Sequence, residues 1–162
     1  MSLRSKNSAI DEIDAAILRT LAEDARMTMA DLARAVGLSA PSVAERVRRL
    51  EEAGIIRGYI ADIDPTALGL PLAAYVRVRP MPGQLNKTVD VLRSLEAVVE
   101  CDRVTGEDCF VAKAHVRSMQ DLERVIDRII PFAMTNTSVI QSSPVGRRLP
   151  PLPQGASRVR RR

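Results

Sequence analysis

The stretch from Thr28 to Arg57 decides the fold, and it reads TMADLARAVGLSAPSVAERVRRLEEAGIIR. The hydroxyl of Thr28 and the carboxylate of Asp31 can cap free amide groups, so we expect a helix to begin here. Gly37 is expected to end this helix, because glycine readily adopts the left-handed conformation that a helix end often needs. Ser39 then offers the cap of a second helix. The stretch therefore predicts two short helices joined by a tight turn.

The second helix of this stretch has an apolar side and a polar side. Val43, Val47 and Leu50 recur at the spacing of one helix face and predict its buried stripe. Arginine can hold phosphates or bind guanine edges with two hydrogen bonds, and serine can contact either group. Such a helix is typical of the recognition helix of a helix-turn-helix, which lies in the major groove of DNA. The residues expected to contact DNA are Ser39, Ser42, Glu45, Arg46, Arg48 and Arg49, with base discrimination assigned to Ser42, Arg46 and Arg49.

A charged helix face can also be no more than a solvated surface with Arg–Glu pairs one turn apart. The turn residues and the apolar stripe favour DNA binding over that simpler interpretation. Gly54 is expected to end the helix, and Ile55, Ile56, Tyr59 and Ile60 then predict a short β wing.

The charge of the chain is unevenly distributed. Its 162 residues include 24 basic and 20 acidic side chains, which gives a formal net charge of +4. Residues 147–162 contain six arginines and no acid, so the rest of the chain has 18 basic and 20 acidic side chains and a net charge of −2. DNA binding by that part must therefore depend on where its arginines lie. The tail itself is either a solvated extension or a source of nonspecific affinity for phosphates.

Several classes of protein are not expected. No run approaches the roughly 20 apolar residues of a membrane helix, and the N-terminus lacks the apolar core of a signal peptide. We therefore expect a soluble, cytoplasmic protein without a membrane partner. Cys101 and Cys109 lack the spacing of metal ligands and are expected to be free thiols. The single histidine, His115, is expected to be a packing or surface residue, so no catalytic residue, metal or cofactor is predicted.

The chain divides into two predicted domains of the α+β class. A helix whose start is signalled by Ser8 and Asp11 precedes the helix-turn-helix, and together with the wing it makes a winged helix-turn-helix over residues 9–60. Residues 61–69 form a linker, and residues 70–148 form a second domain in the order βαββαβ. That order predicts a ferredoxin-like (ACT-like) domain, with one sheet and two helices on one of its faces. The expected strands are 72–79, 98–105, 109–116 and 137–143, the expected helices are 85–97 and 118–130, and residues 1–8 and 149–162 are expected to be disordered.

The alternation along residues 72–78 and 111–116 predicts apolar side chains on both faces of this sheet. Two helices cover one face only, so the other face needs a partner. Face-to-face dimerisation is the simplest solution, and a dimer also presents two reading helices to a two-fold DNA site.

The chain also resembles the Lrp/AsnC family, the feast/famine transcription regulators of bacteria and archaea. The resemblance covers nearly the whole chain, to about Leu149, and it implies homodimers that assemble further into tetramers or octamers. It also implies that the second domain binds a small effector, an amino acid or a related metabolite. The matching residues are Ile13-Asp14, Ile17-Leu18-x-x-Leu21, Asp24-Ala25-Arg26, Leu32-Ala33, Val36-Gly37-Leu38-Ser39, Val43-x-x-Arg46-Val47-x-x-Leu50-Glu51-x-x-Gly54-x-Ile56, Gly58-Tyr59, Asp64-Pro65 and Gly69.

The resemblance points to an effector site formed by two segments at one edge of the sheet. The first is a turn that matches the family's effector-binding turn, although Cys109 stands where the family has an aspartate and Asp108 comes one place earlier. The second is a run of hydroxyl and amide side chains that can hold a ligand carboxylate. Alternatively, Gly106 only forms a hairpin and the second segment is only an edge strand. The expected effector-binding residues are Gly106, Glu107, Asp108, Cys109, Thr135, Asn136, Thr137 and Ser138.

Two other functions fit the same two-domain layout. The siroheme decarboxylases resemble it, but such an enzyme needs a basic pocket with histidines, and this chain has only His115. The second alternative keeps DNA binding and makes the other domain a ligand-free oligomeriser of an architectural DNA protein. The main prediction is a sequence-specific transcription regulator controlled by an amino acid or a related metabolite.

Overall fold

The computed structural model describes residues 10–152, which divide into two compact units. The first unit combines the residues up to Ala61 with those from Gly146 onward, and the second consists of Asp62–Val145. Each unit has its own hydrophobic core. The predicted disordered residues 1–8 and most of the predicted tail lie outside the described residues.

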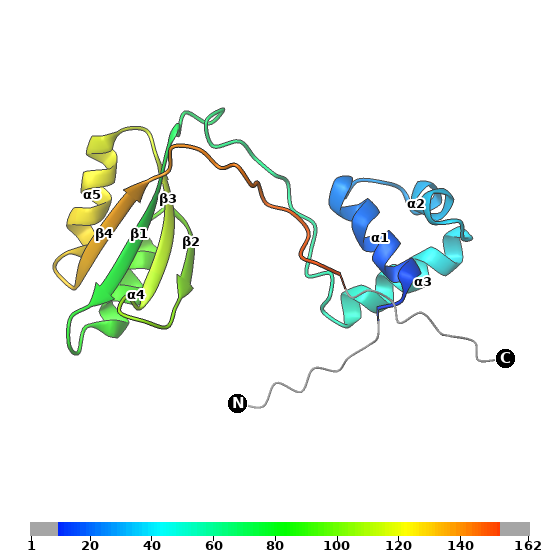
Figure 1. The fold of residues 1–162 in the computed structure, drawn as a ribbon, viewed down its shortest axis with the longest axis horizontal. Helices are drawn as coiled ribbons and strands as arrows, with labels where there is room; N and C mark the ends of the chain where they lie inside the picture. Colours follow the sequence, from blue (N-terminus) through cyan, green and yellow to red (C-terminus); the bar gives the residue numbers. More distant parts are fainter. Residues whose placement is uncertain (1–9, 153–162) are drawn as a thin grey trace. The chain divides into compact units, whose positions relative to one another are not determined.

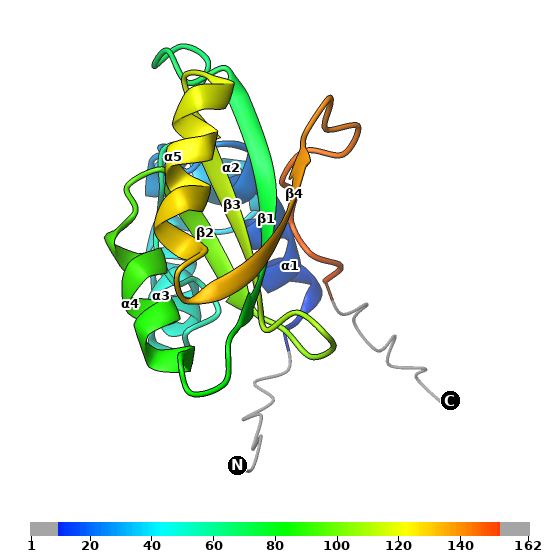
Figure 2. The same cartoon turned by 90° about the vertical axis from the view of Figure 1, so that its left-hand side faces the viewer.

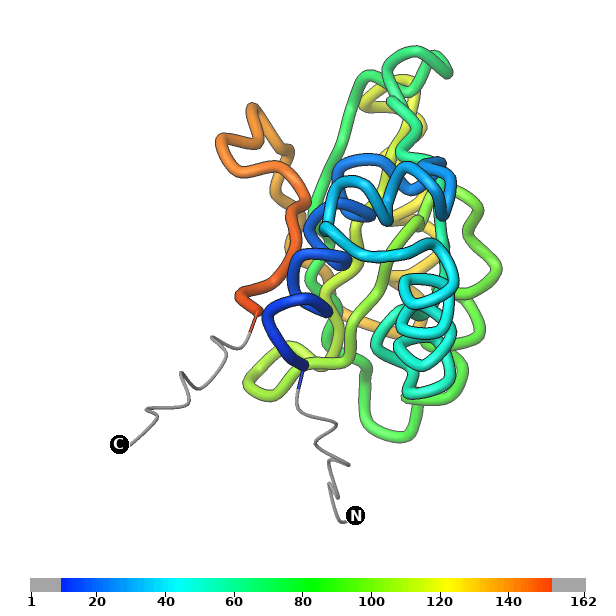
Figure 3. The backbone as a smooth tube through the Cα atoms, turned by 90° about the vertical axis from the view of Figure 1, so that its right-hand side faces the viewer, coloured from blue at the N-terminus to red at the C-terminus, as the bar shows by residue number. Residues whose placement is uncertain are grey.

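The first unit contains three helices, as expected (Figure 3). Asp11 and Asp14 form a reciprocal capping box, so the first helix begins beside Asp11 and not at Ser8. The side chains of Thr28 and Ser39 cap the next two helices, which confirms both predicted starts. The helices are α1 (Glu12–Glu23), α2 (Met29–Val36) and α3 (Ala40–Glu52).

The turn between α2 and α3 also forms as predicted. Gly37 has a φ angle of 71°, in the left-handed region that glycine tolerates best. The amide of Leu38 donates to the carbonyl of Ala33 at 3.0 Å, and the Leu38 side chain packs against the core. The turn therefore brings the apolar stripes of both helices onto α1. The buried residues of this core are Ile17, Leu18, Leu21, Leu32, Ala33, Val43, Val47 and Leu50.

The segment after α3 forms no β-strand, so the strand expected over residues 55–60 is absent from this structure. Gly54 follows the helix with a φ angle of 68°, and the amide of Ile55 turns back to the carbonyl of Leu50. Tyr59 donates a hydrogen bond of 2.9 Å to Glu51 on α3, and burial together with this carboxylate raises the pKa of Tyr59 to about 12. A strand needs a second strand to pair with, and the described residues of this unit contain none.

The second unit has the predicted βαββαβ order. Its strands form one antiparallel sheet in the order β2-β3-β1-β4. Helices α4 and α5 pack on the same face of this sheet, as Figures 1 and 2 show. The ferredoxin-like fold is therefore confirmed. The elements are β1 (Leu72–Pro80), α4 (Leu85–Ser94), β2 (Val98–Arg103), β3 (Phe110–Val116), α5 (Met119–Ile129) and β4 (Ala133–Val139).

The last strand begins four residues earlier than predicted and ends four residues earlier. Pro131 lacks the amide hydrogen that would continue α5, so the chain turns there. The amide of Phe132 donates to the carbonyl of Ile129, and Ala133 pairs with Pro80 of β1 immediately afterwards. The polar residues that follow pair with β1 as far as Val139.

The two faces of the sheet differ in polarity. Ala74, Val76 and Val78 of β1 are fully buried on the helix side. The residues between them, including Tyr75 and Arg77, are exposed on the other side. The period of two sends the fully buried aliphatic side chains of β1 to the helix side, so on this strand the expectation of apolar residues on the open face holds for Tyr75 and fails for Arg77 and Arg79.

The C-terminal segment belongs with the first unit. Leu152 is partly buried and packs against the core of the three helices. Figures 1 and 3 show the described chain ending beside the start of α1. Leu152 is therefore placed with the first unit, although the prediction assigned residues 149–162 to a disordered tail. Removing the leucine side chain from water stabilises this docking, although the segment has no regular secondary structure.

No helix in the described part of the chain is long and apolar enough to cross a membrane. Cys101 and Cys109 are free thiols, and burial raises the pKa of Cys101. Among residues 10–152 no group of three potential metal ligands comes together.

Replacing a core leucine of the first unit should be far more destabilising than replacing an exposed one. Leu32 is fully buried, so Leu32→Ala should lower the free energy of unfolding by about 2–5 kcal/mol. Leu68 is 64% exposed, and Leu68→Ala should change it by less than about 0.5 kcal/mol. Urea unfolding of both variants measures the difference, and equal losses would contradict the assigned core.

Candidate DNA interface and effector site

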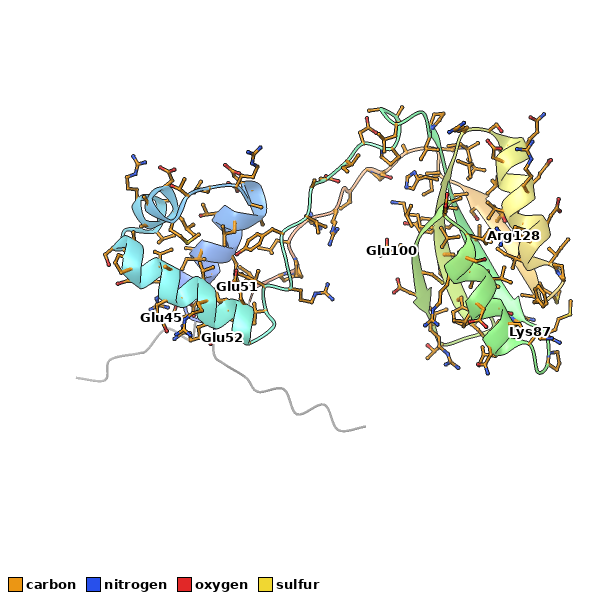
Figure 4. All side chains as sticks on the ribbon, turned by 180° about the vertical axis from the view of Figure 1, so that it is seen from behind. Glu45, Glu51, Glu52, Lys87, Glu100 and Arg128 are labelled. Atoms are coloured by element: carbon orange, nitrogen blue, oxygen red, sulfur yellow. The ribbon has the colours of Figure 1, made fainter. Side chains whose placement is uncertain are left out.

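Helix α3 presents a polar face because its apolar stripe is buried behind it. Val43, Val47 and Leu50 pack against α1 and α2, as predicted. Ser42, at the N-terminal end of the helix, is exposed, and its hydroxyl lies 2.8 Å from that of Ser39. Farther along, the exposed face carries arginines and glutamates. Figure 4 labels Glu45, Glu51 and Glu52, which follow one another along α3.

Arg48 lies at the centre of this exposed face. Its guanidinium contacts Glu45 at 2.7 Å and Glu52 at 2.6 Å, one turn before and one turn after it. All three side chains are more than half exposed. Hydrogen bonds and charge from Arg48 hold the pKa of Glu45 below its ordinary value. Solvent screens such pairs, so an incoming phosphate or base edge can replace a carboxylate partner of Arg48.

Arg46 does not face outward as predicted. Its Nη1 atom lies 2.7 Å from Oδ2 of Asp11 and 2.7 Å from Oδ1 of Asp14, both on the first helix or its cap. Only 24% of the Arg46 side chain is exposed, against 3% for Asp14. Arg49 approaches the same Asp14 carboxylate at 3.1 Å, although it remains half exposed. The prediction of three outward arginines therefore holds for Arg48 and only partly for Arg49.

This carboxylate–arginine cluster joins the start of α1 to the middle of α3. Asp14 accepts the arginines of α3 and also the Asp11 amide at 3.3 Å, while its own amide donates to Asp11 at 2.7 Å. Partial burial raises the pKa of Asp11, but hydrogen bonds from Asp14 and Arg46 outweigh it, and the pKa lies below its ordinary value. The ionised Asp11 carboxylate therefore stabilises the fold fully at pH values above its ordinary pKa. This stabilisation is lost as the pH falls through the lowered pKa.

Sequence reasoning missed this role of Asp14. From the sequence alone, Asp14 is one of several acids near the start of the first helix, where the helix dipole favours negative charge. One signal did exist, because Asp14 interrupts the apolar series Ile10, Ile17 and Leu21 on one face of α1. A charge within an apolar face is seldom buried without a partner. Arg46 and Arg49 of α3 are the partners in this structure.

The predicted effector turn is the hairpin between β2 and β3. Gly106 has a φ angle of 119°, which favours glycine. Glu107 is held by Arg79 of β1, whose Nε donates to the Glu107 carbonyl at 2.9 Å while its Nη2 contacts the carboxylate at 2.8 Å. The amide of Cys109 donates to the Val78 carbonyl at 3.0 Å. The turn is thus fixed to the end of β1, and the half-buried Asp108 forms no ion pair with any residue of the described chain.

The two predicted effector segments lie on opposite sides of β1 but near the same end of it, because Val78 pairs with Thr135 and its carbonyl accepts the Cys109 amide. The turn joins β2 to β3, whereas Thr135–Ser138 lie on β4, and β1 runs between β3 and β4. Within β4, Thr135 and Thr137 are half-buried, whereas Asn136 and Ser138 are exposed. Alternation therefore sends the four side chains to opposite faces. The hydroxyl of Thr137 is buried without a hydrogen-bond partner among the described residues.

A groove that sequence reasoning did not predict lies between α4 and β2. Its volume is about 490 Å³, within the range of small-molecule sites. Leu85, Val89 and Phe110 supply apolar lining, and Arg93 and Arg103 supply charge. The pairing of β2 with β3 shifts register between Val98 and Glu100, beside this groove. No feature of the sequence predicts that shift.

These features define a helix-turn-helix protein with a second, ferredoxin-like domain, and comparison with known proteins agrees. Residues 10–57 match the family model of winged helix-turn-helix DNA-binding domains, and residues 73–150 match that of the Lrp/AsnC ligand binding domain. The chain is 40% identical to the HTH-type transcriptional regulator LrpA of Mycobacterium tuberculosis over 132 residues, which cover 81% of this chain and 88% of LrpA.

Solved structures show the same relationship. The structure of Bacillus subtilis LrpC matches with a TM-score of 0.81 at 34% identity, and covers 85% of this chain and 98% of LrpC. A feast or famine regulatory protein of M. tuberculosis, solved with L-methionine, matches with a TM-score of 0.80 at 37% identity, over 87% of this chain and 98% of the other.

The chain therefore belongs to the Lrp/AsnC family of DNA-binding transcriptional regulators. The family and its relatives are transcriptional regulators and not enzymes, and no finding favours the siroheme-decarboxylase alternative.

Removing the shared carboxylate should destabilise the first unit. Asp14→Asn removes one of the two carboxylate partners of Arg46 and the carboxylate that pairs with Arg49. The free energy of unfolding should therefore fall by about 1–3 kcal/mol. Glu52→Gln is the matched control, because it breaks only an exposed pair, with Arg48. Urea unfolding should show a clear loss for the first variant and little change for the second. Equal midpoints for Asp14→Asn and the unchanged chain would contradict the cluster's role.

Proposed function

We propose that this regulator reads its DNA site with the exposed face of α3. The exposure of Arg48, on a helix whose opposite stripe is buried, carries this proposal. Ser39 and Ser42 stand at the N-terminal end of the helix, and Arg49 remains half exposed beside Arg48. Arg46 holds the helix in place through its carboxylate partners. The proposed DNA-contacting residues are Ser39, Ser42, Glu45, Arg48 and Arg49, with Arg46 in a supporting position.

The chemistry of these side chains suits different parts of the duplex. Arg48 can form two hydrogen bonds to a guanine, and Glu45 can accept one from a cytosine amino group. The serines at the start of the helix can contact phosphates together with backbone amides. Base discrimination is therefore assigned mainly to Arg48, in place of the Ser42, Arg46 and Arg49 to which the sequence assigned it.

Arg48→Ala should reduce the preference for the cognate site by roughly fivefold to more than a hundredfold, the value of one good base contact. The cognate site is first selected from random-sequence DNA by the full chain, and affinities for that site and a scrambled site are then compared by fluorescence anisotropy. Arg19→Ala, which removes an exposed charge from α1, is the control and should keep the preference. An Arg48 variant with full preference would contradict the assignment.

We further propose that the chain forms a homodimer through the open face of its sheet, with tetramers or octamers built from such dimers. An exposed aromatic side chain and charged side chains of both signs support this interface. Tyr75, on the central strand β1 of the sheet, is 45% exposed. Arg77 and Lys113 lie on β1 and β3, while Glu100 and Asp102 lie on the neighbouring β2. A second copy can therefore place its acidic strand opposite the basic pair of the first. Such a dimer presents two α3 helices to a two-fold DNA site.

We propose that the effector is an amino acid or a related metabolite. The complex of a relative with L-methionine supports this class of ligand. Of the carboxylates in the turn, Glu107 is paired with Arg79, so Asp108 is the better candidate to bind an ammonium group. The full site needs further groups, and a second subunit of the proposed dimer or higher assembly would supply them.

A thermal-shift series with amino acids at millimolar concentration tests the effector proposal. A ligand at 100 times its dissociation constant should stabilise the chain by about 2.7 kcal/mol. Asp108→Asn should remove this shift, whereas Arg103→Gln, a change in the groove beside α4, should keep it. If only Arg103→Gln abolished the response, the effector site would not lie at the turn. If no amino acid gave a shift, the proposed class of ligand would be wrong.

A further inference from the structure

The groove between α4 and β2 has apolar walls. Leu85, Val89 and Leu92 of α4 line one side of it, and Val98 of β2 and Phe110 of β3 line the other. Leu85, Val89 and Val98 are half-buried, so they contribute to the core and to the groove. Leu85 and Leu92 lie seven residues apart on α4, which corresponds to about 10 Å along the helix. The groove, with a volume of about 490 Å³, can therefore hold an extended aliphatic chain.

The charges that face the groove are positive. Arg93 and Arg103 line it, and neither takes part in an ion pair among residues 10–152. Glu100 is the one acidic residue of the lining, and it pairs in register with Lys113 of β3. Ala112, the neighbour of Lys113, is fully buried on the helix side, so alternation turns Lys113 and Glu100 toward the open face of the sheet. The groove therefore favours an anionic ligand.

The topology places one of the two arginines beside the start of α4. Arg103 pairs with Phe110, which pairs in turn with Val78 near the end of β1. Helix α4 leads from that end of β1 back to the start of β2, so its first turn lies at the Arg103 end of the groove. Asn86 in this turn offers an amide group, and the helix dipole favours negative charge there. Arg93 lies in the last turn, where the dipole has the opposite sign.

We propose that the groove is a second small-molecule site, which binds a medium-length aliphatic carboxylate. Arg103 and Asn86 hold the carboxylate, and the aliphatic chain lies along the apolar side chains of α4. Burial of the chain supplies most of the affinity, and the charge-assisted hydrogen bond from Arg103 selects an anion. The lining does not include the turn with Asp108, so this site is separate from the proposed amino-acid site and needs no ammonium group on its ligand.

Calorimetric titration of the full chain with octanoate tests the charge of the site. Arg103→Gln should lower the affinity for octanoate about tenfold or more, the value of a hydrogen bond to a charged group. Arg117→Gln is the matched control and should keep the affinity, because Arg117 is exposed in the same unit and does not line the groove. Equal affinities of the two variants for octanoate would overturn the site.

The length of the ligand tests the apolar wall without changing the protein. Hexanoate should bind more weakly than octanoate, by up to about fourfold for each methylene removed. Octylamine has the same chain with a positive charge, so it should bind more weakly than octanoate. An affinity that does not depend on chain length, or that is higher for the amine, would contradict the proposed class of ligand.

The two cysteines report where the ligand binds. Cys101 is exposed and lines the groove, whereas Cys109 is half-buried at the hairpin beside Asp108 and is not part of the lining. Saturating octanoate should slow the alkylation of Cys101 by iodoacetamide several-fold and leave the rate at Cys109 unchanged, as measured by mass spectrometry of peptides. Protection of Cys109 in place of Cys101 would move the ligand to the turn and overturn the groove as its site.

This test is independent of the proposed function. A chain that binds DNA through α3 and responds to amino acids, but does not bind octanoate, would overturn the groove site alone.

Discussion

The buried carboxylate of Asp14 is the constraint on which the DNA-binding unit depends. A carboxylate that is only 3% exposed needs charged hydrogen-bond partners, and here Arg46 and Arg49 provide them. Because both arginines belong to α3 and Asp14 belongs to α1, satisfying this charge fixes how the two helices meet. The apolar stripe of α3 determines which side of the helix is buried. The pairing of Arg46 and Arg49 with Asp14 then fixes where along α3 the helix contacts α1. The exposed face centred on Arg48 follows from both.

The same pairing divides the arginines of α3 into two kinds. Arg46 is largely covered and bound to two carboxylates, so moving it to DNA would leave Asp14 unpaired in the interior. Arg48 is more than half exposed, and solvent screens its partners, so exchanging them for DNA groups removes little stability. Side chains of one chemical type on one helix therefore have different roles, which are decided by burial.

Local signals in the sequence predicted the helices well, because the caps at Thr28 and Ser39 and the left-handed turn at Gly37 involve only near neighbours. The βαββαβ order of elements along the second domain also followed from alternation and turn residues. The failures concern interactions between distant residues. Arg46 meets Asp14 across 32 positions, and no periodicity of α3 reveals that pairing. Leu152 lies in a proline-rich stretch whose composition indicates disorder, yet its side chain packs partly buried against the core of the three helices.

Separating attraction from recognition has a physical advantage for a regulator. Positive charge on a reading helix increases affinity for every DNA sequence equally, and so it raises the occupancy of competing sites as much as that of the operator. Pairing the α3 arginines with carboxylates reduces this general attraction. Arg48, whose carboxylate partners are exposed to solvent, can then contribute to the preference between bases without raising the affinity for every sequence. A change at Arg48 can therefore alter the base preference without disturbing the buried carboxylate of Asp14, which positions the helix through Arg46 and Arg49.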